Sequence, residues 1–121
     1  MFKRKLDEGN KGEDIASEYL KDNGFVIIER NFRIRGGEID IIATKKDILI
    51  FVEVKTRTST QFGTGFEAIT PWKLKALIRA SQFFKMSHKN LPDQMRIDAI
   101  SVLLRSDNSL KKLEHMENIT G

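Results

Sequence analysis

The spacing of apolar residues predicts a helix early in the chain. Side chains at helical intervals form one apolar stripe, comprising Ile15, Ala16, Tyr19 and Leu20. Asn10 is a typical N-cap, Glu13 stands three residues later as in a capping box, and Gly24 ends the pattern. We therefore expect a helix from Asn10 to Gly24.

Three runs of β-branched and apolar residues follow this helix, at residues 25–29, 37–44 and 48–57. Arginines and two glycines separate the first two runs, which predicts a basic loop between two strands. Only Lys45, Lys46 and Asp47 separate the second run from the third. This short polar connection predicts an antiparallel hairpin.

The hairpin connection also predicts a register. If Lys46 and Asp47 form a two-residue turn, Lys45 pairs with Ile48 and Asp40 lies directly opposite Glu53. The dipeptide Lys46-Asp47 is not the Asn-Gly or Asp-Gly that tight hairpin turns favour. A slip of one residue would turn Asp40 to the other face of the sheet, so both registers stay open.

The second half of the chain predicts one helix and two strands. Residues 58–70 are polar and contain glycine, which predicts a loop that contacts a substrate. Thr70 as N-cap and Pro71 at the first helical position predict a helix to about Ser87. Strands are expected at residues 95–104 and 110–116, joined by a turn at 106–109. The expected fold is α/β, with the order αβββαββ in a single domain spanning residues 1–121.

The composition of the chain indicates the cellular environment of the protein. The chain has 121 residues, of which 40% are hydrophobic and 31% charged, and no apolar stretch approaches the ~18 residues that span a bilayer. The basic start, residues 1–5, is followed by polar residues rather than the apolar run of a signal peptide. We therefore expect a cytoplasmic protein that does not enter a membrane.

Charge is distributed unevenly along the chain. The net charge is +4, and residues 61–90 alone hold five lysines and arginines against the single acid Glu67. Clustered basic charge favours a polyanionic partner such as nucleic acid. A lysine-rich helix face that is merely solvated is the alternative reading.

Four residues carry the candidate chemistry, namely Glu13, Asp40, Glu53 and Lys55. Side chains two apart on a strand emerge on one face, so Glu53 and Lys55 lie roughly 6.6 Å apart along the backbone. Asp40 and Glu53 sit among apolar neighbours, where a charge needs a partner. Without any cysteine, a metal at these acids should be hard and oxygen-bound, such as Mg²⁺ or Mn²⁺.

Each of these residues also has a structural reading. Glu13 serves equally well as a capping residue of its own helix. Lys55 could pair with Glu53 as a salt bridge, or with Asp40 as a buried ion pair. The two histidines, His88 and His115, have no serine or cysteine arrangement to activate and enter no mechanism.

The order Glu13, Asp40, Glu53-Val54-Lys55 resembles the nuclease superfamily that includes restriction endonucleases and archaeal Holliday junction resolvases. Over nearly the whole chain the sequence looks like the bacterial YraN family of nuclease-like proteins. The residues that carry this likeness are Gly12-Glu13, Ala16, Tyr19-Leu20, Arg30-Asn31, Gly37-Glu38-Ile39-Asp40, Phe51-Val52-Glu53-Val54-Lys55, Arg57, Lys73, Arg96-Ile97-Asp98 and Glu114-His115-Met116-Glu117-Asn118. The ending Ile119-Thr120-Gly121 departs from the family's usual aromatic ending.

The resemblance implies a restriction-endonuclease-like three-layer core, a mixed β-sheet flanked by helices. It implies that Asp40, Glu53 and the Val54 carbonyl hold Mg²⁺ or Mn²⁺, with Glu13 as an outer or additional ligand. Lys55 would position or help deprotonate the attacking water. Nucleic-acid contacts would come from a basic set comprising Arg30, Arg33, Arg35, Arg57 and Lys73, although arginines near a turn are often only solvated.

Three hypotheses of function follow. The leading one is a magnesium-dependent endonuclease that hydrolyses phosphodiester bonds in structured or branched DNA, for which a homodimer would supply two active sites. The second is a nucleic-acid-binding module without turnover. The third is a nuclease subunit that needs a protein partner, with Phe62, Phe66 and Trp72 as its contact surface.

Overall fold

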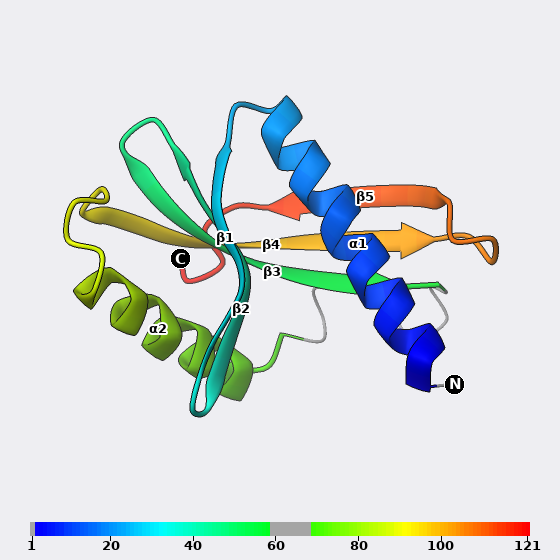
Figure 1. The fold of residues 1–121 in the computed structure, drawn as a ribbon, viewed down its shortest axis with the longest axis horizontal. Coiled ribbons are helices and arrows are strands. Elements are labelled where there is room, and N and C mark those ends of the chain that lie inside the picture. The colour runs from blue at the N-terminus through cyan, green and yellow to red at the C-terminus, as the bar shows by residue number, and fades with distance from the viewer. Residues whose placement is uncertain (1, 59–68) are drawn as a thin grey trace.

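The computed structural model describes residues 2–58 and 69–121, so most of the predicted loop, including Phe62 and Phe66, lies outside the described residues. The elements follow the predicted order αβββαββ (Figure 1). They are α1 (Phe2–Asp22), β1 (Val26–Ile34), β2 (Gly37–Lys45), β3 (Ile48–Arg57), α2 (Pro71–Met86), β4 (Gln94–Leu104) and β5 (Leu110–Met116). No helix in this described part is both long and apolar enough to cross a membrane.

The five strands form one mixed sheet in the order β1-β2-β3-β4-β5. Strands β3 and β4 are parallel, and their crossover connection contains α2, while the other neighbours are antiparallel. Helix α1 packs Ala16 and Leu20 on one face of the sheet, and α2 packs Leu77 and Phe84 on the other (Figure 1). The predicted three-layer α/β fold is confirmed.

Helix α1 begins earlier than predicted. It starts at Phe2, so Asn10 and Glu13 lie inside the helix, and the prediction of a capping box there is wrong. Residues 2–8 contain no proline or glycine, and the helix that they form continues through Gly9 and Asn10. The predicted end is correct, since Gly24 adopts φ +88°, a left-handed conformation that glycine reaches without strain.

Strand β1 is longer than predicted, because it continues to Ile34. Arg30 pairs with Ile41 and Arg33 with Glu38, so the expected basic loop is largely a strand. The physical reason is Phe32, which alternates with the arginines and packs its ring against Phe84, with ring centroids 5.1 Å apart.

The hairpin of β2 and β3 has the predicted register. Lys45 pairs with Ile48, and the ladder runs on to the pair Ile41 and Val52. Lys46 takes φ +55°, so the turn between β2 and β3 forms although it lacks the glycine that such turns favour. Beyond Ile41 the ladder ends while both strands continue, and the β1–β2 hairpin bends away from β3 (Figure 1). The strands therefore form a fork at Asp40 and Glu53.

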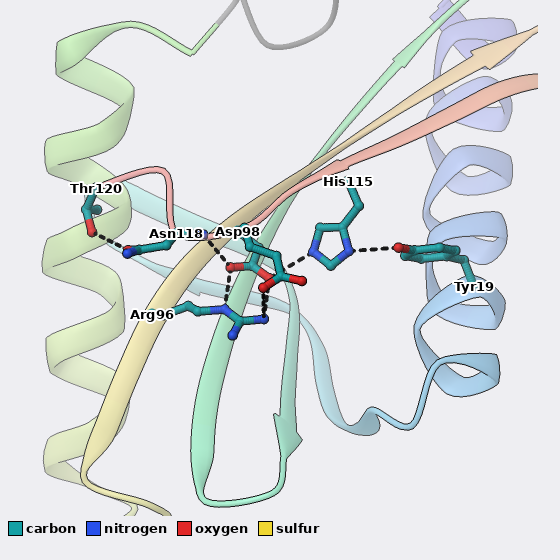
Figure 2. A network of polar contacts seen from close by, with 7 residues as sticks. Tyr19, Arg96, Asp98, His115, Asn118 and Thr120 are labelled. Carbon is teal, nitrogen blue, oxygen red and sulfur yellow. Dashed lines mark hydrogen bonds and ion pairs between the residues drawn. The ribbon is translucent and has the colours of Figure 1, made fainter.

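A polar network centred on buried Asp98 ties the C-terminal segment to β4, β5 and α1 (Figure 2). Asp98 is fully buried and accepts hydrogen bonds from Arg96, at 2.8 and 3.1 Å, and from the backbone N–H of Asn118. His115 Nε2 lies 2.8 Å from Asp98, and its Nδ1 lies 2.9 Å from the hydroxyl of Tyr19 on α1. His115 is thus a structural residue that links α1, β4 and β5.

Burial alone would raise the pKa of Asp98, but the hydrogen bonds from His115, Arg96 and Asn118 outweigh it and lower this pKa. A lowered pKa in the folded state means that ionised Asp98 stabilises the protein at neutral pH. This contribution is lost as the pH falls through the folded-state value.

The two acids beside Arg96 allow a matched test of this network. We expect Asp98→Asn to lower the free energy of unfolding by on the order of 3 kcal/mol, because it leaves the half-buried Arg96 charge without its main partner. Glu117 also pairs with Arg96, at 3.4 Å, but is 62% exposed. Glu117→Gln should therefore cost less than about 1 kcal/mol. Urea unfolding at neutral pH measures both, and equal losses would contradict the assigned role of Asp98.

Close packing of α1 on β3 generates a second prediction. A Cβ added at Gly12 would lie 2.8 Å from Cβ of Thr56 and overlap its hydroxyl. Glycine to alanine in a helix interior ordinarily stabilises by about 1 kcal/mol. Here we expect Gly12→Ala to destabilise by about 1–3 kcal/mol through the forced separation. Glu18→Ala, at an exposed position of the same helix, is the control in thermal unfolding, and a stabilised Gly12→Ala would show that α1 can shift freely.

Candidate functional site at the strand fork

Asp40 stands where β2 leaves β3. Its Oδ2 accepts a hydrogen bond of 2.8 Å from the backbone N–H of Val54. A side chain of β2 thus takes the place of a backbone partner just beyond the last ladder pair. This contact fixes the carboxylate at the opening of the fork, next to the strand that carries Glu53 and Lys55.

Glu53 is buried, with 3% of its surface exposed, and is held from two sides. Its Oε1 lies 3.5 Å from Nζ of Lys55 on the same strand and 3.5 Å from Nζ of Lys73 on α2. Its Oε2 is also buried and has no hydrogen-bond partner among the described residues. One carboxylate oxygen therefore remains available to a ligand.

Burial shifts the ionisation of both acids, and the charge of Glu53 also shifts that of Asp40. Burial and the neighbouring charge of Glu53 raise the pKa of Asp40 to about 7, although the Val54 N–H opposes this. Burial also raises the pKa of Glu53, with the ammonium groups of Lys73 and Lys55 acting in the opposite direction. The positive charge of Lys55 and Lys73 is thus too small to keep both carboxylates ionised without a cost in free energy.

Glu13 approaches the same region from α1. Its Oε1 lies 3.5 Å from Nη2 of Arg30, close enough for an ion pair but without a hydrogen bond of good geometry. Burial raises the pKa of Glu13, and so does the charge of Asp40, while Arg30 and Asn31 lower it. The helix placement removes the capping interpretation and leaves Glu13 beside the fork.

The acids do not form a compact three-carboxylate cluster. Within residues 10–58 and 69–121, whose side chains the structure describes, no three acidic or histidine side chains stand close enough together to serve as a ready set of metal ligands. Asp40 and Glu53 share the fork, and Glu13 is held to one side by Arg30. The role of Glu13 as an outer or additional ligand stays a prediction.

The predicted basic residues have different surroundings. Arg30 pairs with Glu13 and, at 2.9 Å, with Asp14, so it is committed to α1. Arg33 pairs with Glu38 at 3.3 Å but is largely exposed, and Arg35 is exposed in the β1–β2 turn. The remaining two are Arg57, which lies at the end of β3, and Lys73, which belongs to the fork itself.

A hollow of about 540 Å³ lies between the β1–β2 turn and the start of α2. Its lining combines turn and helix residues, comprising Arg33, Ile34, Gly36, Gly37, Glu38, Lys73 and Ala76. Because Lys73 both lines this hollow and contacts Glu53, the hollow opens beside the fork.

Sequence reasoning grouped Lys73 with the nucleic-acid contacts and missed its pairing with Glu53. The local signal was present, since Thr70 Oγ1 accepts the N–H of Lys73 at 3.1 Å and Pro71 follows the cap. That signal places Lys73 in the first helical turn. Only the packing of α2 on the sheet brings that turn to Glu53.

Comparison with known proteins gives a consistent result. The model of a family described as "Uncharacterised protein family UPF0102" matches residues 12–102, a range that contains Glu13, Asp40, Glu53, Lys55 and Lys73. A UPF0102 protein of Leifsonia xyli is 49% identical over 100 residues, covering 82% of this chain and 85% of the relative. Another, of Caldicellulosiruptor saccharolyticus, is 41% identical over 118 residues and 98% of each chain. The chain belongs to the UPF0102 family, which is the YraN family that its motifs resemble.

Proposed function

We propose that this protein is a metal-dependent DNA endonuclease that hydrolyses phosphodiester bonds in structured or branched DNA. The observation that carries the proposal is the pair of acids at the strand fork, Asp40 and Glu53. Burial raises the pKa of both acids, the charge of Glu53 raises that of Asp40 further, and a buried oxygen of Glu53 has no hydrogen-bond partner among the described residues. Such a pair is stabilised by a bound cation.

The donor atoms fit a hard divalent cation. Carboxylate oxygens of Asp40 and Glu53 and the backbone carbonyl of Val54 would hold Mg²⁺ or Mn²⁺, with Glu13 as an outer ligand. When bound, the cation would polarise a phosphoryl oxygen of the substrate. The chain has no cysteine and so offers no thiolate ligand, which agrees with this choice of metal.

Lys55 is the proposed positioning group for the attacking water. Its ammonium lies 3.5 Å from Glu53, and its side chain is about one quarter exposed, so it faces both the acids and the solvent. An ammonium there attracts a water or hydroxide and stabilises negative charge that develops on the phosphate. Lys73 would add a second positive charge on the same side of Glu53.

Basic side chains would hold the DNA backbone beside the fork. Arg33 and Lys73 line the hollow, and Arg35 is exposed in the adjoining turn. Arginine grips phosphate oxygens through two parallel hydrogen bonds, which suits Arg33 and Arg35 to this task. Arg30 would act indirectly, through its ion pair with Glu13. Arg57, at the end of β3, would contact the DNA backbone there. A cytoplasmic location and a homodimer, which would cut two strands symmetrically, belong to the same proposal.

One observation favours a second function, a nucleic-acid-binding module without turnover. Lys55 and Lys73 both contact the same oxygen of Glu53, so the site already contains part of the positive charge that a metal would supply. Salt-sensitive DNA binding without cleavage would then be the whole activity. Under either function, a protein partner is a further candidate ligand at the exposed Trp72.

Metal binding and cleavage test the proposal together. We expect Mg²⁺ or Mn²⁺ to bind the wild-type protein in isothermal calorimetry, and Asp40→Ala and Glu53→Ala to abolish the heat, because each variant removes a ligand. Lys55→Ala should retain metal binding but lower the cleavage rate of branched DNA by about 10²–10³-fold. Asp107→Asn, an exposed acid in the turn after β4, is the control. Metal binding that survives in both alanine variants would exclude this site.

The ionisation of Asp40 predicts a pH dependence of stability. Its pKa is about 7 in the folded protein and about 3.9 in an unfolded chain. The folded state therefore holds more protons between these values, so the free energy of unfolding falls as pH rises through this window. We expect Asp40→Asn to be more stable than wild type at about pH 8, by about 2–4 kcal/mol, and nearly equal at about pH 4.

Denaturation with urea across this pH range measures the difference. Mg²⁺ should stabilise the wild-type protein selectively and narrow the gap at high pH, because it binds only the folded acids. Asp14→Asn, an exposed acid on α1, should keep the wild-type pH profile. Parallel profiles for wild type and Asp40→Asn would show that the fork tolerates both charges without a cation.

A further inference from the structure

The first turn of α2 exposes a tryptophan beside the fork. Trp72 is 79% exposed, the largest exposed fraction among the bulky apolar side chains of residues 10–58 and 69–121. The next residue, Lys73, reaches Glu53 at 3.5 Å. Trp72 is therefore the immediate chain neighbour of a residue whose side chain contacts the candidate site.

The helix start fixes the backbone that carries this ring. Thr70 caps α2 through the hydrogen bond from the Lys73 N–H, and Pro71 occupies the first helical position. A capped helix start with proline has little backbone freedom. Because the backbone that carries it is already fixed, the exposed Trp72 ring loses little conformational entropy when a ligand binds it.

The same face of α2 borders the hollow. Trp72, Ala76 and Arg79 are spaced by four and three residues and so lie along one side of the helix. Ala76 lines the hollow, and Arg79 lies 3.5 Å from the carbonyl oxygen of Gly36 in the β1–β2 turn. Trp72 thus stands at the end of this stripe that is nearest to the start of the helix and to Lys73.

The charge around the tryptophan indicates a polyanion. Helix α2 contains several cationic residues and no acid, the cations being Lys73, Lys75, Arg79 and Lys85. Nζ of Lys75 lies 5.4 Å from the centroid of the Trp72 ring. An aromatic ring among cations suits a nucleotide, whose base stacks while its phosphate pairs with the cation. An uncharged protein surface would gain nothing from these lysines.

We propose that Trp72 is a stacking platform for an unpaired base of DNA, whose backbone passes through the hollow beside Arg33 and Lys73. This inference rests on the proposed function and narrows its substrate. A base inside a duplex is already stacked on both faces, so the ring meets an unpaired nucleotide at lower cost. The preferred DNA therefore carries a single-stranded segment next to the bond that is cut, as in a flap, a gap or a splayed arm.

Intrinsic fluorescence reports directly on this contact, because Trp72 is the single tryptophan of the chain. The full chain is titrated with oligothymidylate of about 12 nucleotides in the presence of EDTA, so that binding is measured without cleavage. We expect the single strand to quench the emission, and a blunt duplex of the same length to quench it much less. A duplex that quenches as strongly as the single strand would overturn the proposal.

Substitutions on one helix separate stacking from charge. Because Trp72→Ala and Trp72→Phe lack the tryptophan signal, their affinities are measured by the fluorescence anisotropy of a dye-labelled oligonucleotide. Trp72→Ala should bind it roughly 5- to 150-fold more weakly, as expected for loss of one stacked base. Trp72→Phe should recover part of this affinity. Met86→Ala removes another exposed apolar side chain at the far end of α2 and should bind like wild type. Circular dichroism checks that each variant is folded, and an unchanged affinity in folded Trp72→Ala would refute the stacking role.

Binding and cleavage can fail separately. If Trp72 stacks on the single strand but no DNA is cleaved with Mg²⁺ or Mn²⁺, the platform stands and the endonuclease proposal fails. If branched DNA is cleaved and Trp72→Ala cleaves and binds it like wild type, the endonuclease stands and the platform fails. Asp107→Asn, at an exposed acid in the turn after β4, should keep the wild-type affinity for the oligonucleotide, since it leaves α2, the fork and the hollow unchanged.

Discussion

The hydrogen bond from the Val54 N–H to Asp40 determines the geometry of the whole site. It forms where the ladder between β2 and β3 ends, so it secures a carboxylate at a point where two strands separate. Strand separation leaves backbone groups without their regular partners, and the Asp40 side chain satisfies one of them. The fold thereby gains a charged group that sits between strands, within electrostatic reach of Glu53 and close to the helix that carries Glu13.

The resulting cluster is held in a balance of opposing charges. Burial disfavours ionisation of Asp40 and Glu53, and the charge of Glu53 adds to that cost for Asp40. Lys55 and Lys73 reduce the cost for Glu53 but touch only one of its oxygens. By contrast, Asp98 is also buried, but Arg96, His115 and the Asn118 N–H donate hydrogen bonds to it, and its pKa is lowered. The protein can therefore stabilise a buried carboxylate completely, and at the fork it does so only in part.

The sequence predicts those features that depend on local pattern. The register of the β2–β3 hairpin follows from the length of its turn, and the order of elements follows from alternation and helical spacing. The sequence is a poor guide to features that depend on packing between residues far apart in the chain. Arg30 and Arg33 resemble a solvated loop until Phe32 is seen to pack on Phe84, and Asn10 resembles a helix start although the preceding residues continue the helix. His115 gives no signal of its partners, because Tyr19 and Asp98 lie 96 and 17 residues away along the chain.

Topology explains why a basic helix start and an acidic fork meet at all. Strands β3 and β4 are parallel, so the chain must cross from the end of β3 back to the start of β4, and α2 makes this return. A helix that returns in this way begins near the end of the strand that precedes it. Glu53 and Lys55 lie toward that end of β3, and Lys73 lies in the first turn of α2. The crossover thus brings Lys73 to the acids. Crossovers of this kind place ligand sites at the carboxyl ends of strands in α/β sheets.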